Sequence, residues 1–380
     1  MTAVPLAALR PFSRLASPRE VVRQFTPNWF AVTMGTGILA LALAALPGVS
    51  PAVRAAAEGL WILNAGLFGL FSVLYAARWV LFFDGAQRIF GHAVVSMYFG
   101  CIPMGLATIV NGLLIFGLPR WGQVAVEAAH ALWLADAALS VVCGMAIPYL
   151  MFTRQSHGLE QMTAVWLLPM VASEVAAVTA GLLAPHVTDP AARLEVLTAG
   201  YGLWALSVPL ALGVLVILFL RLALHKLPPA AMAASSWLAL GPIGTGALGL
   251  LVLGAAAPSI LAANGLGELG AAARGVCLIG GLALWAYGLW WLAMAVLFTA
   301  RYLRGGLPFN IGWWGYTFPL GVFAVATLKL GGQLPIPALA VAGEALVASL
   351  AAVWLVVAAR TAAGAWRGEL FHSPCLSDAV

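Results

Sequence analysis

Long apolar runs alternate with short polar or charged breaks along almost the whole chain. A run of about 20 apolar residues is enough for a helix to cross the hydrocarbon core of a bilayer. The breaks carry Pro, Gly and single charges, so the pattern predicts ten membrane-spanning helices joined by short links. The expected spans are 29–46, 56–77, 92–117, 124–152, 164–184, 196–220, 236–257, 273–300, 313–329 and 338–359.

Composition places the chain in the all-α membrane class. Of its 380 residues, 63% are hydrophobic and 8% are charged, whereas a soluble domain is about half apolar and a quarter charged. We expect a transmembrane transport domain at 29–360, a basic N-terminal segment at 1–28 and a short cytoplasmic tail at 361–380. The N-terminus lacks the apolar core of a cleaved signal peptide. The high Ala, Gly and Leu content suits a bacterial inner membrane.

The basic residues predict the orientation of the spans. If the N-terminus is cytoplasmic, the outer links hold only Arg54, Arg120, Arg193, Arg274 and Lys329 of the 18 Lys and Arg. The others lie in inner segments, as the positive-inside rule requires of a chain with an even number of spans and both termini in the cytoplasm. Because these charges are dispersed at helix ends, they do not indicate nucleic-acid binding.

A short helix is predicted before the first span. Ser17 and Glu20 have the spacing of a capping box, Pro18 takes the first helical position, and Pro27 would end the helix. We expect this helix to lie along the inner membrane surface; a disordered basic tail is the alternative.

The odd-numbered spans share a helix-breaking feature. Four of them hold a proline that the pattern places in mid-helix, and the first holds Gly35-Thr36-Gly37 instead. Broken helices are tolerated at membrane depth where they face protein or a wet cavity. The repeat therefore predicts five helical hairpins whose odd helices line a central pore. The four prolines are Pro103, Pro169, Pro242 and Pro319.

Hydroxyl side chains are the candidate polar groups of this pore. No Lys or Arg is expected in the middle of an odd span, so hydroxyls and backbone dipoles would bind an anion weakly, which suits rapid passage. The candidates on the odd spans are Thr33, Thr36, Thr108, Ser173, Thr245 and Thr317.

Carboxyl groups within spans need a separate explanation, because a charge in the bilayer costs at least about 2.5 kcal/mol. Glu174 lies on the fifth span, and three interpretations stay open: it hydrogen-bonds a neighbouring helix, it is a protonatable coupling site, or it tunes selectivity. Asp136, six residues after His130, is expected to make one interhelical hydrogen bond and no His-Asp pair. Glu344, on the tenth span, is expected to be structural or to lie at a subunit contact.

Signatures of enzymes and metal sites are missing from the sequence. It has neither a His-Glu-x-x-His zinc motif nor a Gly-x-Ser-x-Gly nucleophile elbow, and its six His and four Cys are dispersed. We therefore expect no catalytic residue, no metal and no cofactor. A membrane-embedded enzyme or a structural protein is a distant alternative to a transporter.

Several motifs resemble those of the tellurite-resistance/dicarboxylate transporter family, which includes plant slow anion channels, yeast malate permeases and fungal sulfite efflux pumps. The first is Phe25-Thr-Pro-Asn-Trp-Phe-Ala-Val-Thr-Met-Gly-Thr-Gly37, and the second is Trp313-Trp-Gly-Tyr-Thr-Phe-Pro-Leu-Gly321. Trp166-Leu-Leu-Pro169 and Gly241-Pro-Ile-Gly244 add to the match. The resemblance extends over residues 24–360.

The resemblance implies ten helices in five hairpins, a pore through each subunit and assembly as a homotrimer. It also implies that Phe318, in Tyr-Thr-Phe-Pro, plugs the pore. The expected function is passage of small anions: a C4-dicarboxylate such as malate, sulfite, another oxyanion such as tellurite, or a halide. A proton-coupled dicarboxylate carrier is the alternative, and Glu174 makes it slightly more attractive.

Overall fold

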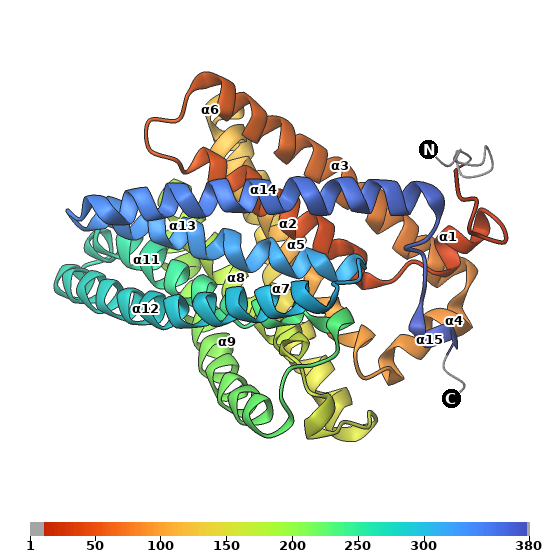
Figure 1. Ribbon diagram of the computed structural model, residues 1–380. Coiled ribbons are helices and arrows are strands. Elements are labelled where there is room, and N and C mark those ends of the chain that lie inside the picture. Colours follow the sequence, from red (N-terminus) through yellow and green to blue (C-terminus); the bar gives the residue numbers. More distant parts are fainter. Residues whose placement is uncertain (1–10, 378–380) are drawn as a thin grey trace.

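Ten long apolar helices make up most of the protein in the computed structural model, which describes residues 11–377 (Figure 1). The ten expected spans are confirmed, although the even-numbered spans extend up to eight residues beyond an expected end. The observed spans are Pro27–Ala44, Pro51–Leu81, Val95–Trp121, Gln123–Thr153, Ala164–His186, Pro190–His225, Ala230–Ala263, Gly267–Gly305, Ile311–Gln333 and Pro337–Arg367.

Each odd span pairs with the even span that follows it. The main helices of the odd spans are α2 (Phe30–Ala44), α5 (Cys101–Gly112), α8 (Leu168–Leu183), α11 (Leu240–Ala263) and α13 (Phe318–Gln333). Those of the even spans are α3 (Pro51–Leu81), α7 (Gln123–Thr153), α9 (Pro190–His225), α12 (Gly267–Gly305) and α14 (Pro337–Arg367). Contacts within the pairs α2/α3, α5/α7, α8/α9, α11/α12 and α13/α14 confirm the five hairpins.

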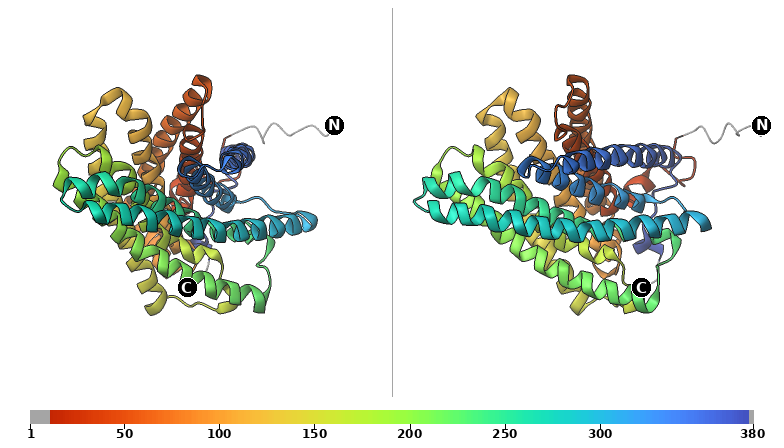
Figure 2. Two further views of the ribbon diagram at one scale, coloured as in Figure 1. Left: turned by 90° about the vertical axis from the view of Figure 1, so that its left-hand side faces the viewer. Right: turned by 60° about the vertical axis from the view of Figure 1, so that its left-hand side comes forward.

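The odd helices form a closed inner ring. Around it, α2 packs on α5, α5 on α8, α8 on α11, α11 on α13, and α13 again on α2. The last hairpin thus lies against the first, as the turned views show (Figure 2). In each odd span, between 67% and 94% of an apolar stretch of 18 residues is buried inside the protein. In the even spans the buried share is 22% to 39%. The even helices are therefore the lipid-facing layer.

Four odd spans are interrupted, but not in the middle of an α-helix. Each begins with a short helical segment and continues as the main helix, and the proline stands in the first turn of that main helix. A proline is tolerated there because the first N–H groups of a helix have no intrahelical partner. The preceding segments are Val95–Gly100, Ala164–Leu167, Ser235–Leu238 (α10) and Ile311–Tyr316.

The break expected at Gly35-Thr36-Gly37 is absent, since α2 is continuous through these residues. The two glycines instead allow close packing. A side chain at Gly35 would collide with Trp314 and Thr317, and one at Gly37 would collide with Thr108 and Asn64. The motif therefore holds α2 against its two neighbours in the ring.

Both ends of the described chain lie on one side of the bundle, which we call the terminal side; the opposite side is the far side (Figure 1). The N–H groups of Phe12 and Arg14 donate to the carbonyls of Trp366 and Arg367 at the end of α14. Arg78 of α3 is 1% exposed and donates to the carbonyls of Phe25 and Gly85 and to the Ser373 hydroxyl. The terminal segments thus connect the first hairpin to the last.

The short helix before the first span is α1 (Arg19–Arg23). Its N-cap is Pro18, no side chain caps it, and Glu20 bonds forward to Arg23 and Gln24 instead. The capping box was therefore a wrong prediction. The last helix, α14, continues to Arg367, seven residues into the segment expected to be the tail. The remaining short helices are α4 (Phe83–Gln87), α6 (Leu118–Trp121) and α15 (Pro374–Ser377).

Candidate functional site

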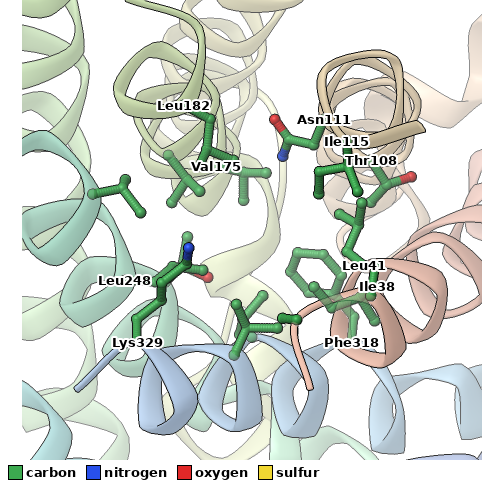
Figure 3. Close-up of a pocket in the computed structure, with 17 residues that line it drawn as sticks. Ile38, Leu41, Thr108, Asn111, Ile115, Val175, Leu182, Leu248, Phe318 and Lys329 are labelled. Carbon is green, nitrogen blue, oxygen red and sulfur yellow. The ribbon is translucent and has the colours of Figure 1, made fainter. Parts of the chain in front are cut away.

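A cavity of about 210 Å³ lies inside the ring of odd helices (Figure 3). All five helices contribute side chains to it, and most of these are apolar. The cavity therefore lies inside the ring of odd helices, where the five-hairpin repeat predicted a pore. Its lining includes Ile38 and Leu41 of α2, Thr108 and Asn111 of α5, Val175 and Leu182 of α8, Thr245 and Leu248 of α11, and Phe318 and Val322 of α13.

Phe318 lies at the terminal-side end of this central cavity. Its side chain is 4% exposed and also lines a second, much smaller space of about 20 Å³ on the terminal side. That smaller space is bordered by Met34, Leu168 and Leu238 from three other odd spans. A phenyl ring between two apolar spaces obstructs an ion by its size and by excluding water.

One face of α13 extends from Phe318 to the far side. Phe318, Val322, Val325 and Lys329 all line the central cavity, and their spacing of three or four residues places them on a single helix face. Lys329 also lines a wide far-side vestibule of about 810 Å³. Its ammonium group therefore stands where the central cavity meets the vestibule.

Three polar side chains besides Lys329 line the central cavity. The Thr108 hydroxyl donates to the Gly105 carbonyl and accepts from the Asn64 amide, at 2.7 and 2.9 Å. The Thr245 hydroxyl and the Asn111 amide oxygen have no hydrogen-bond partner within residues 11–377. Thr108 is therefore engaged by the protein, whereas the Thr245 hydroxyl and the Asn111 oxygen are buried without a partner among the described residues.

Neither the central cavity nor the vestibule is lined by Asp or Glu in the described chain. Glu174 is fully buried on α8 but is not part of the cavity lining, which α8 supplies through Val175, Val178 and Leu182. Its carboxyl lies beside the Ser207 hydroxyl of α9. Neither carboxyl oxygen has a hydrogen-bond partner among the described residues, and the Ser207 hydroxyl donates to the Met170 carbonyl instead. Glu174 therefore faces a neighbouring helix, as the first of the three interpretations has it, but without the expected hydrogen bond.

Four of the six candidate hydroxyls do not line the central cavity. Thr33 and Thr317 donate to the carbonyls of Phe30 and Trp314 one turn earlier, at 2.7 Å each. Thr36 accepts from the Trp354 indole of α14 at 3.1 Å, and Ser173 faces α7. These groups stabilise helix packing, so only Thr108 and Thr245 are brought together in the cavity.

The kink residues are likewise outside the central cavity. Gly35 and Gly37 lie at helix contacts, and Pro103, Pro169 and Pro242 are not among the lining residues. Pro319 borders the small space on the terminal side of Phe318. Asp136 does not make the expected interhelical bond, because neither of its oxygens has a hydrogen-bond partner in the part of the chain that the structure describes.

Sequence reasoning missed Lys329 and Asn111 as cavity residues. Lys329 was assigned to an outer link, but α13 continues past it to Gln333. The missing signal was periodicity, since Lys329 lies 11 residues after Phe318 and therefore on the same helix face. Asn111 lies three residues after Thr108 and could have been found in the same way.

The chain matches the family model described as SLAC1, voltage-dependent anion channel, over residues 24–362. It is 38% identical over 355 residues to the sulfite efflux pump SSU1 of Trichophyton rubrum, covering 92% of this chain and 93% of that protein. It is 29% identical to the uncharacterized transporter MJ0576 of Methanocaldococcus jannaschii, with 93% and 97% of the two chains covered.

A third relative is the malic acid transport protein of Schizosaccharomyces pombe, 26% identical over 350 residues, with 88% of this chain and 77% of that protein covered. These relatives come from fungi and an archaeon, so they do not support the bacterial inner membrane that composition suggested. The ring of odd helices, the central cavity and the family match agree with the resemblance seen in the motifs. The chain therefore belongs to the SLAC1 family of voltage-dependent anion channels, and it is a multi-pass membrane protein that transports anions rather than an enzyme.

Proposed function

We propose that this protein conducts small oxyanions, sulfite foremost, through a pore in each subunit that Phe318 closes. The observation that carries the proposal is the central cavity inside the five-helix ring, which ends at the Phe318 ring. The absence of Asp and Glu from the described cavity lining suits an anion. Sulfite is preferred over malate because the 38% identical relative is named a sulfite efflux pump, whereas the malic acid transport protein is 26% identical.

The terminal side faces the cytoplasm in this proposal, so the vestibule opens outward. The support is the positive-inside rule, because most Lys and Arg lie at the terminal-side ends of the spans. An anion leaving the cell would pass Phe318, cross the central cavity and leave past Lys329.

Passage without proton coupling is favoured over a coupled carrier. A coupling carboxyl has to exchange protons with the permeation path, and Glu174 is buried beside Ser207 of α9, outside the cavity lining. No carboxyl of the described chain lines the cavity or the vestibule. The flux should therefore follow the electrochemical gradient of the anion alone.

Glu174→Gln is expected to leave anion flux unchanged within about twofold, because the side chain does not meet the permeating ion. The measurement is malate and chloride flux from proteoliposomes at a fixed membrane potential, with and without a pH gradient. Both anions stay fully ionised near neutral pH, so the gradient acts only on the protein. Empty liposomes and the wild type are the controls.

Wild-type malate flux that follows the pH gradient, together with loss of this dependence in Glu174→Gln, would contradict uncoupled passage. The coupled carrier would then be the better description. Absence of flux for sulfite, malate and chloride in every variant would contradict anion conduction itself.

Assembly as a homotrimer is supported by the surface of α14. Glu344 is exposed on this lipid-facing helix and forms no ion pair within the described residues. A carboxylate facing lipid is costly, and a neighbouring subunit that covers it would remove the cost. We expect native mass spectrometry of the detergent-purified protein to give three times the subunit mass of 39.5 kDa; a monomeric mass would contradict the trimer.

A further inference from the structure

Three odd helices direct hydrogen-bond donors to the same part of the central cavity. Lys329 of α13 and Asn111 of α5 point into it from opposite sides (Figure 3), and Thr245 of α11 lines it as well. The nitrogen of the Asn111 amide faces the cavity, while its oxygen points away (Figure 3). The donors are an ammonium, an amide and a hydroxyl.

Two of these donors have no partner among the described residues. The Thr245 hydroxyl is buried without a hydrogen-bond partner, and the exposed Lys329 forms no ion pair with a described carboxylate. Thr108 in the same cavity differs, because its hydroxyl already donates to the Gly105 carbonyl. Buried polar groups are usually satisfied, so the unpartnered Thr245 hydroxyl beside the cavity indicates that a ligand supplies its acceptor.

The position of Lys329 suits an ion that has to leave again. It lies about 16 Å along α13 from Phe318, at a rise of 1.5 Å per residue. The ammonium is partly exposed to the vestibule, where the one other titratable side chain among the described residues is His186. A cation at an open mouth attracts anions without holding them as tightly as a fully buried charge would.

The volume of the central cavity fits a small oxyanion together with part of its hydration shell. At about 30 Å³ for each water molecule, a cavity of this size holds the equivalent of about seven waters. A pyramidal oxyanion can present a different oxygen to each donor, and its charge strengthens each bond. A halide accepts all of its hydrogen bonds at one centre, so donors on opposite sides of the cavity suit it less well than an anion with several oxygens (Figure 3).

We propose that Lys329, Asn111 and Thr245 form an oxyanion-selective binding site between the vestibule and Phe318. The site binds anions with two or more charged oxygens, such as sulfite, in preference to chloride. This assignment rests on the proposed function, since it makes the same pathway selective. Lys329 supplies the positive charge, and the neutral donors Asn111 and Thr245 make the site prefer sulfite over chloride.

Binding of sulfite and chloride to the detergent-purified protein, measured by calorimetry, tests the site without relying on transport. Lys329→Gln should raise the Kd for sulfite about tenfold, because it removes a charge-assisted hydrogen bond. Asn111→Leu and Thr245→Val should lower the preference for sulfite over chloride. Arg274→Gln is the matched control, because it removes an exposed cation near the start of α12 that lines neither space.

Flux of both anions through the same variants separates the two proposals. Equal effects of Lys329→Gln and Arg274→Gln, or an unchanged preference for sulfite in all three cavity variants, would overturn the binding site even if flux is normal. Selective sulfite binding that depends on Lys329, in a protein that conducts no anion, would support the site and overturn the conducting function.

Discussion

Phe318→Ala is expected to raise anion flux through the reconstituted protein about tenfold or more, which corresponds to lowering the barrier by at least about 1.4 kcal/mol. The ring lies between the central cavity and the small terminal-side space, and its removal would join them. The increase should occur for sulfite and chloride alike, since a plug obstructs by size. The measurement is flux from proteoliposomes at equal protein content.

Phe323→Ala is the matched control for this prediction. Phe323 lies on the same helix and is also fully buried, but it stacks against Trp285 of α12 with ring centroids 6.2 Å apart and does not line the cavity. Its loss should weaken packing without opening the path. If both variants raised flux equally, the increase would come from loosened packing and the gate assignment would be wrong.

Arg78→Leu should lower the free energy of unfolding by more than about 3 kcal/mol, because it leaves several buried acceptors without a donor. The acceptors are the carbonyls of Phe25 and Gly85 and the hydroxyl of Ser373. They belong to three separate segments of the terminal side, so no single neighbour can replace the guanidinium. We expect the thermal midpoint in detergent to fall by at least roughly 5 °C.

Arg88→Leu removes an exposed arginine from the segment after α4 and serves as its control. If Arg78→Leu and Arg88→Leu had the same thermal midpoint, the buried hydrogen bonds of Arg78 would contribute little to stability. Flux in the surviving fraction of Arg78→Leu should stay near that of the wild type, because Arg78 is not part of the cavity lining.

Hydrophobic pattern and the proline repeat were sufficient to predict ten spans, five hairpins and an inner set of odd helices. Both patterns extend over the whole chain and are periodic, so they identify the spans correctly even when each boundary is wrong by several residues. Phe318 entered as a gate through a motif match alone, since its apolar side chain resembles any other membrane phenylalanine. The structure adds the two spaces that it separates.

The polar residues of the cavity lining were harder to predict. A hydroxyl on an inner helix can donate a hydrogen bond to a backbone carbonyl of the preceding turn and then is not available to the cavity. Thr33 and Thr317 do so, while Thr245 does not, and nothing in their local sequence distinguishes them. Glu174 shows the same difficulty, since the sequence gives its helix but not the helix that it faces. Lys329 was assigned to a link because the end of α13 was placed four residues too early.

The ring of odd helices closes only where α13 meets α2, and these helices belong to opposite ends of the chain. During synthesis the hairpins emerge in order, so the first four would form an open crescent before the fifth exists. Contacts between such distant segments pay the largest loop-closure entropy and are expected to form last. Because α13 carries both Phe318 and Lys329, the step that closes the ring also brings in Phe318, the proposed gate. We therefore expect no folding intermediate in which the ring is closed but the proposed gate is missing.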